Sequence, residues 1–168
     1  GSFFEGAARV PMLVRAPWIE GATDYHGLVS LTDVTATILA CAGVERPSTM
    51  VDTTPLPALD LTDEPAREQV AGMLRQGWML ARDRWKLIKY GGGGDILFDL
   101  EADPGEWNNL SGTMGYYETE YELQNLIMEV FDPDAIQRRV TESLPSRLLI
   151  RSVMEDQQVK WDYRPEKR

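Results

Sequence analysis

The sequence predicts an α/β chain, in which the edge of an α/β domain is followed by a small four-stranded antiparallel sheet packed with helices. Three observations predict this fold class. A continuous apolar segment and an amphipathic helix occur near the start, four short strand-like segments follow in the middle, and the remainder has helical periodicity.

The first element is the apolar run at residues 8–16, which ends at Pro17. Such a run is typical of a strand buried on both faces in a parallel sheet. Ser30 and Asp33 then have capping-box spacing and predict the start of a helix that ends at Gly43. Its apolar face is expected to consist of residues that recur at helical spacing: Leu31, Val34, Ile38 and either Leu39 or Ala42.

Prolines and turn residues make a long helix improbable over residues 45–67, which we expect to be a surface connection. After it, four short runs bounded by turn signals predict an antiparallel meander: 69–74, 77–82, 85–90 and 96–100. Asp83 and Arg84 form its shortest connection.

The last third of the sequence is helical in pattern. We expect one helix that carries Tyr117, Tyr121 and Val130, a second that begins at Pro133, and a third after Pro145, because proline interrupts a helix from within. The resulting divisions are 1–45, 46–67, 68–135 and 136–168, the last being a helical extension with an aromatic tail.

Composition excludes several classes of function. The 168 residues include 17 Lys+Arg and 27 Asp+Glu, a net charge of −10, and the basic residues form no stripe that could neutralise phosphates, so no nucleic-acid partner is expected. No run of about 18 apolar residues is present, so no membrane partner is expected either. One cysteine and one histidine leave no intrachain disulfide and no His-based metal cluster.

The candidate chemical residues each have a simpler interpretation. His26 lies in a polar loop without a nearby nucleophile, which favours a solvated histidine over a catalytic one. Cys41 is expected to be a small core residue rather than a nucleophile. The four glycines at 91–94 precede a strand instead of a helix, so they predict a hairpin loop and not a phosphate site. The acidic residues lack calcium-loop spacing, so we assign no catalytic and no metal-binding residue.

The roles of two further groups of residues remain open. Glu5 and Arg9 are expected to form an ion pair by default, with a polar site at the strand end as the alternative. In the tail, Trp161, Asp162 and Tyr163 combine aromatic faces with a carboxylate, which suits a quaternary ammonium ligand by cation–π attraction. The same residues could equally dock the tail onto a neighbouring surface.

Three segments, 2–11, 29–43 and 85–110, together resemble the C-terminal part of type I sulfatases in the alkaline-phosphatase-like superfamily. The first is similar to the family's aromatic-Glu-Gly-x-x-Arg-Val-Pro segment. The third, which is the most specific, is similar to its Leu-Tyr-Asp-Leu-x-x-Asp-Pro-x-Glu-x-x-Asn-Leu signature. The helical end and Trp161–Pro165 resemble choline-sulfatase-like members.

The resemblance implies hydrolysis of a sulfate ester by a cysteine-derived formylglycine beside a calcium ion. This chain lacks the Cys-x-Pro-Ser-Arg nucleophile segment: its single cysteine, Cys41, follows Ala40 and is followed by Ala42 and Gly43. The resemblance therefore places the nucleophile, the calcium ligands and the sulfate-binding lysine upstream, and this chain alone is predicted to be inactive. Glu5 and Arg9 match the family motif and are expected to support the site.

The resemblance also implies the partners. They are the upstream catalytic part of the same protein and a small sulfate ester. A second copy of the chain is expected as well, because a first strand without its sheet partners would expose an apolar edge and face. Choline sulfate, aryl sulfates and sulfated sugars all remain open as substrates, and the compartment is either cytoplasmic or periplasmic. The chain opens with Gly1 and an early apolar run, so we expect it to begin inside a larger protein. The alternative is a non-catalytic, sulfatase-like interaction module.

Overall fold

The computed structural model describes residues 2–22, 24–60, 66–74 and 77–157. The chain divides into two compact units, Gly1–Ile127 and Met128–Arg168.

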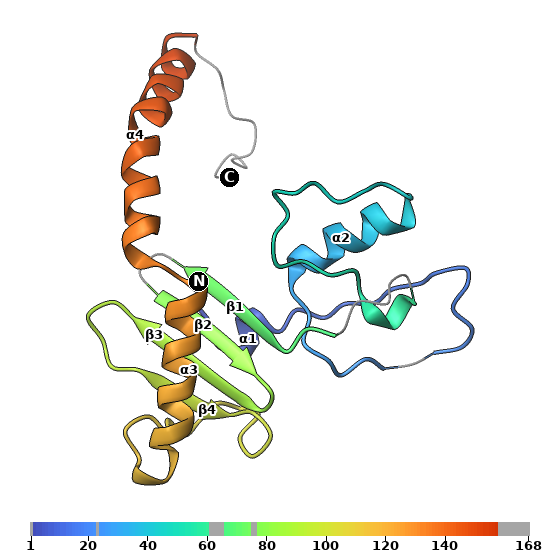
Figure 1. Cartoon of the computed structure of the whole chain (residues 1–168), viewed down its shortest axis with the longest axis vertical. Coiled ribbons are helices and arrows are strands. Elements are labelled where there is room, and N and C mark those ends of the chain that lie inside the picture. Colours follow the sequence, from blue (N-terminus) through green and yellow to red (C-terminus); the bar gives the residue numbers. More distant parts are fainter. Residues whose placement is uncertain (1, 23, 61–65, 75–76, 158–168) are drawn as a thin grey trace, which may run out of the picture. The chain divides into compact units, whose positions relative to one another are not determined.

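The first unit contains a four-stranded antiparallel sheet (Figure 1). Its strands lie in sequence order, β1 (Gln69–Leu74), β2 (Gly77–Arg82), β3 (Trp85–Tyr90) and β4 (Ile96–Asp99). The predicted meander is confirmed, and β4 ends one residue before the expected boundary. Asp83 has a positive φ of 53°, which the two-residue connection between β2 and β3 requires.

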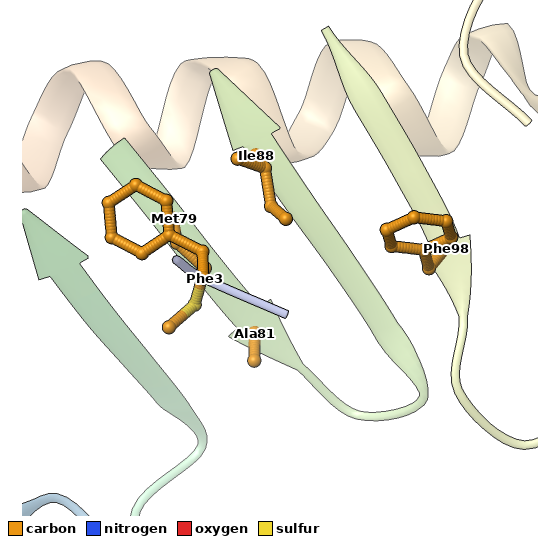
Figure 2. Close-up of a cluster of buried hydrophobic side chains, with 5 residues drawn as sticks. All are labelled: Phe3, Met79, Ala81, Ile88 and Phe98. Carbon is orange, nitrogen blue, oxygen red and sulfur yellow. The ribbon is translucent and has the colours of Figure 1, made fainter. Parts of the chain in front are cut away.

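Strand alternation gives the sheet two buried faces. On one face Met79, Ala81, Ile88 and Phe98 form a hydrophobic cluster with Phe3 from the N-terminal segment. Figure 2 shows these five side chains on the same side of the strands, with a helix passing across the other side.

On that other side Leu80, Leu87 and Leu97 are completely buried. The helix is α3 (Tyr117–Val130), which follows the single turn η2 (Met114–Tyr116) and contributes the buried Leu123 and Ile127. The Gln124 side-chain amide also donates a hydrogen bond of 2.8 Å to Asp95 at the start of β4. One helix and one N-terminal segment thus cover the two faces of the sheet.

The strand predicted over 8–16 is absent. The described structure has a short helix, α1 (Glu5–Ala8), followed by irregular chain in which Leu13 is fully exposed. Val10, Met12 and Val14 are also exposed. A strand needs a neighbour for its backbone N–H and C=O groups, and no described strand pairs with this segment. The prediction of a buried strand is therefore wrong for this chain taken by itself.

Helix α2 (Leu31–Cys41) begins where the sequence predicts. Ser30 accepts a hydrogen bond from the Thr32 N–H, and the Ser30 N–H donates to Asp33 Oδ2 at 2.8 Å, which completes the capping box.

The expected apolar face of α2 is only partly buried: Leu31 and Ile38 are largely exposed and Val34 is half-buried. The fully buried residues of the helix are instead Asp33, Ala36 and Thr37. A hydrogen bond explains this orientation of the helix. Thr37 Oγ1 accepts from the Leu56 N–H at 2.9 Å, which holds the face of α2 that carries Thr37 against the connecting segment. Cys41 is exposed, so the core role predicted for it is also wrong.

The connecting segment has a small core of its own. Leu56 and Leu59, at the 3₁₀ turn η1 (Pro57–Leu59), are buried with Ala16. The Trp18 indole N–H donates a hydrogen bond of 3.0 Å to the Leu59 carbonyl. These contacts fix the irregular chain that follows the exposed apolar run.

The second unit is built on α4 (Pro133–Asp156), whose N-cap Asp132 accepts a hydrogen bond of 2.8 Å from the Ala135 N–H. The predicted break at Pro145 is wrong, because α4 continues through this residue. Pro145 has no N–H to donate to the carbonyl four residues earlier, and side-chain hydrogen bonds form in the same stretch of helix: Ser143 and Arg147 both donate to the Val140 carbonyl. None of the described helices is long and apolar enough to cross a membrane.

Candidate functional site

Three residues far apart in the sequence meet on one face of the sheet, and we name them the Lys86 cluster: Glu5, Lys86 and Glu106. The Lys86 Nζ donates a hydrogen bond of 2.8 Å to Glu5 Oε1 and lies 2.7 Å from Glu106 Oε1. The Glu5 backbone N–H donates to Glu106 Oε2 at 2.5 Å. Each member of the cluster therefore contacts the other two.

The cluster is sheltered from water. The side chains of Lys86 and Glu106 are only 1% and 3% exposed, and that of Glu5 is 25% exposed. Lys86 pairs with Ala81 and Phe98 in the strand register, so it belongs to the same face as the hydrophobic cluster. A buried ammonium is costly unless charged partners surround it, and the two carboxylates meet that need.

A specific loop conformation places Glu106. The chain leaves β4 through a turn in which the Asp103 N–H donates to the Asp99 carbonyl and the Glu106 N–H donates to the Asp103 carbonyl. Glu106 then adopts a φ of +58°, the left-handed region that side chains with a Cβ rarely occupy. Strained backbone of this kind persists where surrounding contacts hold it, and here the Lys86 cluster does so.

A second ionic cluster joins α2 to the connecting segment through Arg67. Its guanidinium donates to both Asp33 oxygens, at 2.6 and 3.0 Å, and also to Asp52. Burial by itself would raise the pKa of Asp33. Hydrogen bonds from Arg67 and from the Ser30 and Thr54 N–H groups outweigh that effect and hold the pKa of this carboxyl below its ordinary value.

A third polar feature is a surface hollow of about 450 Å³. It is lined by His26, Gly27, Leu28, Arg67, Glu68, Arg82 and Asp83. The lining carries both signs of charge and includes neither a hydroxyl nor a thiol nucleophile. His26 is exposed here, in agreement with a solvated loop histidine.

The structure separates the two residues expected to support the site. Glu5 belongs to the Lys86 cluster, whereas the exposed Arg9 side chain makes no ion pair with any residue that the structure describes. The expected Glu5–Arg9 ion pair is wrong, because the Glu5 carboxylate is turned toward Lys86. The remaining predicted residues, Trp161, Asp162 and Tyr163, lie outside the described residues.

Sequence reasoning missed Lys86, Glu106 and Arg67. Strand alternation contained a signal for the first, since Lys86 shares a face with Ile88 and a charge on a buried face needs a partner. No local pattern identifies partners 81 and 34 residues away, as in Lys86–Glu5 and Arg67–Asp33. Within the described ranges, no group of three or more His, Cys, Asp or Glu side chains could hold a metal ion.

Residues 2–132 match the family model of the N-sulphoglucosamine sulphohydrolase C-terminal region. The chain is 28% identical over 149 residues to human arylsulfatase K, with 78% of this chain and 27% of that protein covered. It is 30% identical over 128 residues to mouse arylsulfatase K, with 66% of this chain and 23% of that protein covered.

A solved structure of a protein in complex with its substrate D-glucosamine-2-N,6-O-disulfate also matches. The identity is 26% and the TM-score 0.50, and the match covers 58% of this chain and 23% of that one. The chain thus spans about a quarter of the length of the arylsulfatase K relatives it matches.

Proposed function

The chain belongs to the family of N-sulphoglucosamine sulphohydrolase C-terminal regions, and on this premise we propose that it serves a full-length sulfatase that hydrolyses a sulfate ester. The observation that carries the proposal is the match of the family model over residues 2–132. The Lys86 cluster supports it, because its three residues come from the first and third segments that resemble type I sulfatases.

We propose that the catalytic groups lie upstream of this chain. Sulfatases of this type use a formylglycine nucleophile and a calcium ion, and the described residues do not fit either group. Cys41 is exposed at the end of α2 outside any nucleophile motif, and no described acidic cluster could hold a metal ion. We therefore assign no catalytic step to a side chain of this chain.

We propose a sulfated amino sugar as the substrate class. The related protein of known structure binds a sulfated glucosamine as its substrate, which favours a sugar over choline sulfate. Aryl sulfates are the second candidate, because arylsulfatases are among the relatives. Trp161, Asp162 and Tyr163 remain proposed contributors to substrate binding.

We propose that the upstream part covers the exposed apolar run at 10–14 and the Leu31/Ile38 face of α2. Val10, Leu13, Leu31 and Ile38 are all more than half exposed. Exposed apolar residues gathered along one segment and one helix face are typical of an interface. A strand of the upstream α/β domain would also pair with the backbone of residues 12–14, for which the described structure shows no backbone–backbone hydrogen bond. A second copy of the chain is proposed as a further partner.

Arg9 remains our proposed supporting residue for the sulfate site. Its guanidinium is exposed, makes no ion pair with described residues, and follows Glu5 by one helical turn. A guanidinium in this state is available to an anionic group.

The test compares the full-length protein with this chain alone. Sulfate release is measured from N- and 6-O-sulfated glucosamine and from an aryl sulfate. We expect release by the full-length protein, none by the chain alone, and a reduced rate in the full-length Arg9→Met variant with Arg15→Met as its control. Equal activity of the chain alone would contradict the upstream assignment. A folded full-length protein that is inactive on both substrates would favour the non-catalytic module.

A further inference from the structure

The Lys86 cluster joins the N-terminal segment to the small sheet at two points. The Glu5 carboxylate accepts from Lys86, and the Glu5 backbone N–H donates to Glu106. Contacts to both the side chain and the main chain of one residue fix its orientation as well as its position. We propose that Glu5, Lys86 and Glu106 are positioning residues, which set the placement of the sulfatase's upstream catalytic part relative to the small sheet. This inference rests on the proposed function.

Apolar contacts alone do not account for this orientation. Phe3 packs in the sheet cluster with its ring 6.0 Å from that of Tyr90, and the Phe4 ring lies 5.6 Å from that of Phe98. Such contacts hold the segment on the sheet, but hydrophobic attraction is not directional. The hydrogen bonds of the Lys86 cluster supply the direction.

The sheet itself has no need of a lysine at position 86. Its neighbours in the strand register are Ala81 and Phe98, and its side chain is buried on the same face as Ile88. An apolar residue would suit that face, whereas a buried ammonium pays a desolvation penalty. The contacts that explain the charge are its two carboxylate partners, and both lie outside the sheet strands. Buried ionic groups that select one arrangement among several are known from other proteins.

The loop after β4 supports the same interpretation. Glu106 adopts an unfavourable φ of +58°, and its carboxylate is directed to both the Lys86 ammonium and the Glu5 N–H. A solvated glutamate would gain nothing from this conformation. The unfavourable backbone conformation of Glu106 has a structural reason if its carboxylate holds the N-terminal segment in place.

The experiment uses the full-length protein and the Lys86→Met variant. Lys89→Met is the matched control, because Lys89 lies on the same strand and forms an ion pair of 2.6 Å with Asp95. Misplacement of catalytic groups by about 1 Å can lower a rate by about a hundredfold. We expect Lys86→Met to lower kcat by about tenfold or more with a smaller change in KM, and to accelerate amide hydrogen exchange across α1. Lys89→Met should change neither kcat nor α1 exchange by more than about twofold.

A second variant separates positioning from stability. The triple variant Glu5→Gln/Lys86→Met/Glu106→Gln removes all three charges and so leaves no unpaired buried charge. Its melting temperature should therefore be higher than that of Lys86→Met and closer to that of the wild type. We expect kcat to stay low, because the directional pairing is gone.

Wild-type kcat in the triple variant, or wild-type kcat and α1 exchange in Lys86→Met, would overturn the inference. If the wild-type full-length protein releases no sulfate, the proposed function fails. The exchange of α1 still decides whether Lys86 holds this segment, and unchanged exchange in Lys86→Met overturns the positioning role in that case too.

Discussion

Asp33 shows how one buried carboxyl can make part of the fold sensitive to acid. Its side chain is 2% exposed and its pKa is held below the ordinary value, because bonds from Arg67 and two backbone N–H groups outweigh the effect of burial. A carboxyl with a lowered pKa in the folded state adds stability above its unfolded pKa of about 3.9. That stability is lost as the pH falls through the lower folded-state pKa.

The Asp33→Asn substitution should therefore have two effects. At pH 7 we expect the free energy of unfolding to fall by about 3 kcal/mol, because the Arg67 charge loses its buried partner. Below about pH 4 the variant should lose less stability than the wild type, since the titrating group is gone. Urea unfolding at both pH values measures this.

The control for this substitution is Asp52→Asn, which removes the other carboxylate beside Arg67. Asp52 is 79% exposed, so its loss should cost less than about 1 kcal/mol. Equal losses in the two variants would contradict the role assigned to Asp33.

Residue-level prediction from the sequence succeeded where the chemistry is local. The Ser30–Asp33 capping box could be predicted because its partners are three residues apart. The same Asp33 carboxylate also binds Arg67, and that contact could not be predicted because it depends on the path of the intervening chain. The Lys86 cluster was missed for the same reason, and the Glu5–Arg9 pair was preferred only because it is close in sequence.

Among the elements, α4 is notable for continuing through a proline. Pro145 lies near the middle of Pro133–Asp156, where it provides no backbone donor. Donation to the Val140 carbonyl by Ser143 and Arg147 provides side-chain hydrogen bonds in the preceding turn. The helix forms despite this residue.

We expect Pro145→Ala to stabilise α4 locally, because alanine restores the backbone N–H and is favoured over proline by about 3 kcal/mol in a helix interior. Amide hydrogen exchange over residues 141–149 should become markedly slower. Ser146→Ala is the control, with an expected gain of about 0.5 kcal/mol from helix propensity alone. Exchange no slower in Pro145→Ala than in this control would contradict the expectation.

The four sheet strands and the start of α2 were predictable, whereas α1, the unbroken α4 and the exposed faces were not. Each meander strand is bounded by turn residues in the sequence, so all four strands could be placed. The apolar faces of 8–16 and α2 were expected to be buried, yet Leu13 and Leu31 are exposed. Periodicity identifies a face that should be covered, but it does not say whether the covering element belongs to the same chain.

For the molecule as a whole, the chain spans about a quarter of the arylsulfatase K relatives it matches. The sheet and α3 have their own buried core, including Leu80, Leu87 and Ile127. The apolar run at 10–14 has no comparable cover from the described residues. The small sheet is thus the self-sufficient part of the first unit, and the N-terminal run is the part whose apolar surface is left uncovered.

The sequential order of the strands has a consequence for the kinetics of folding. Every strand pairs with its neighbour in sequence, whereas the Glu5–Lys86 contact closes a loop of 81 residues. The entropy cost of closure rises with loop length, so we expect the hairpins to form first and the N-terminal segment to attach last. Pulse-labelling hydrogen exchange should find the β2 and β3 amides protected before the Glu5 amide, and simultaneous protection would contradict this order. During refolding, the sheet would then serve as the template on which the N-terminal segment is assembled.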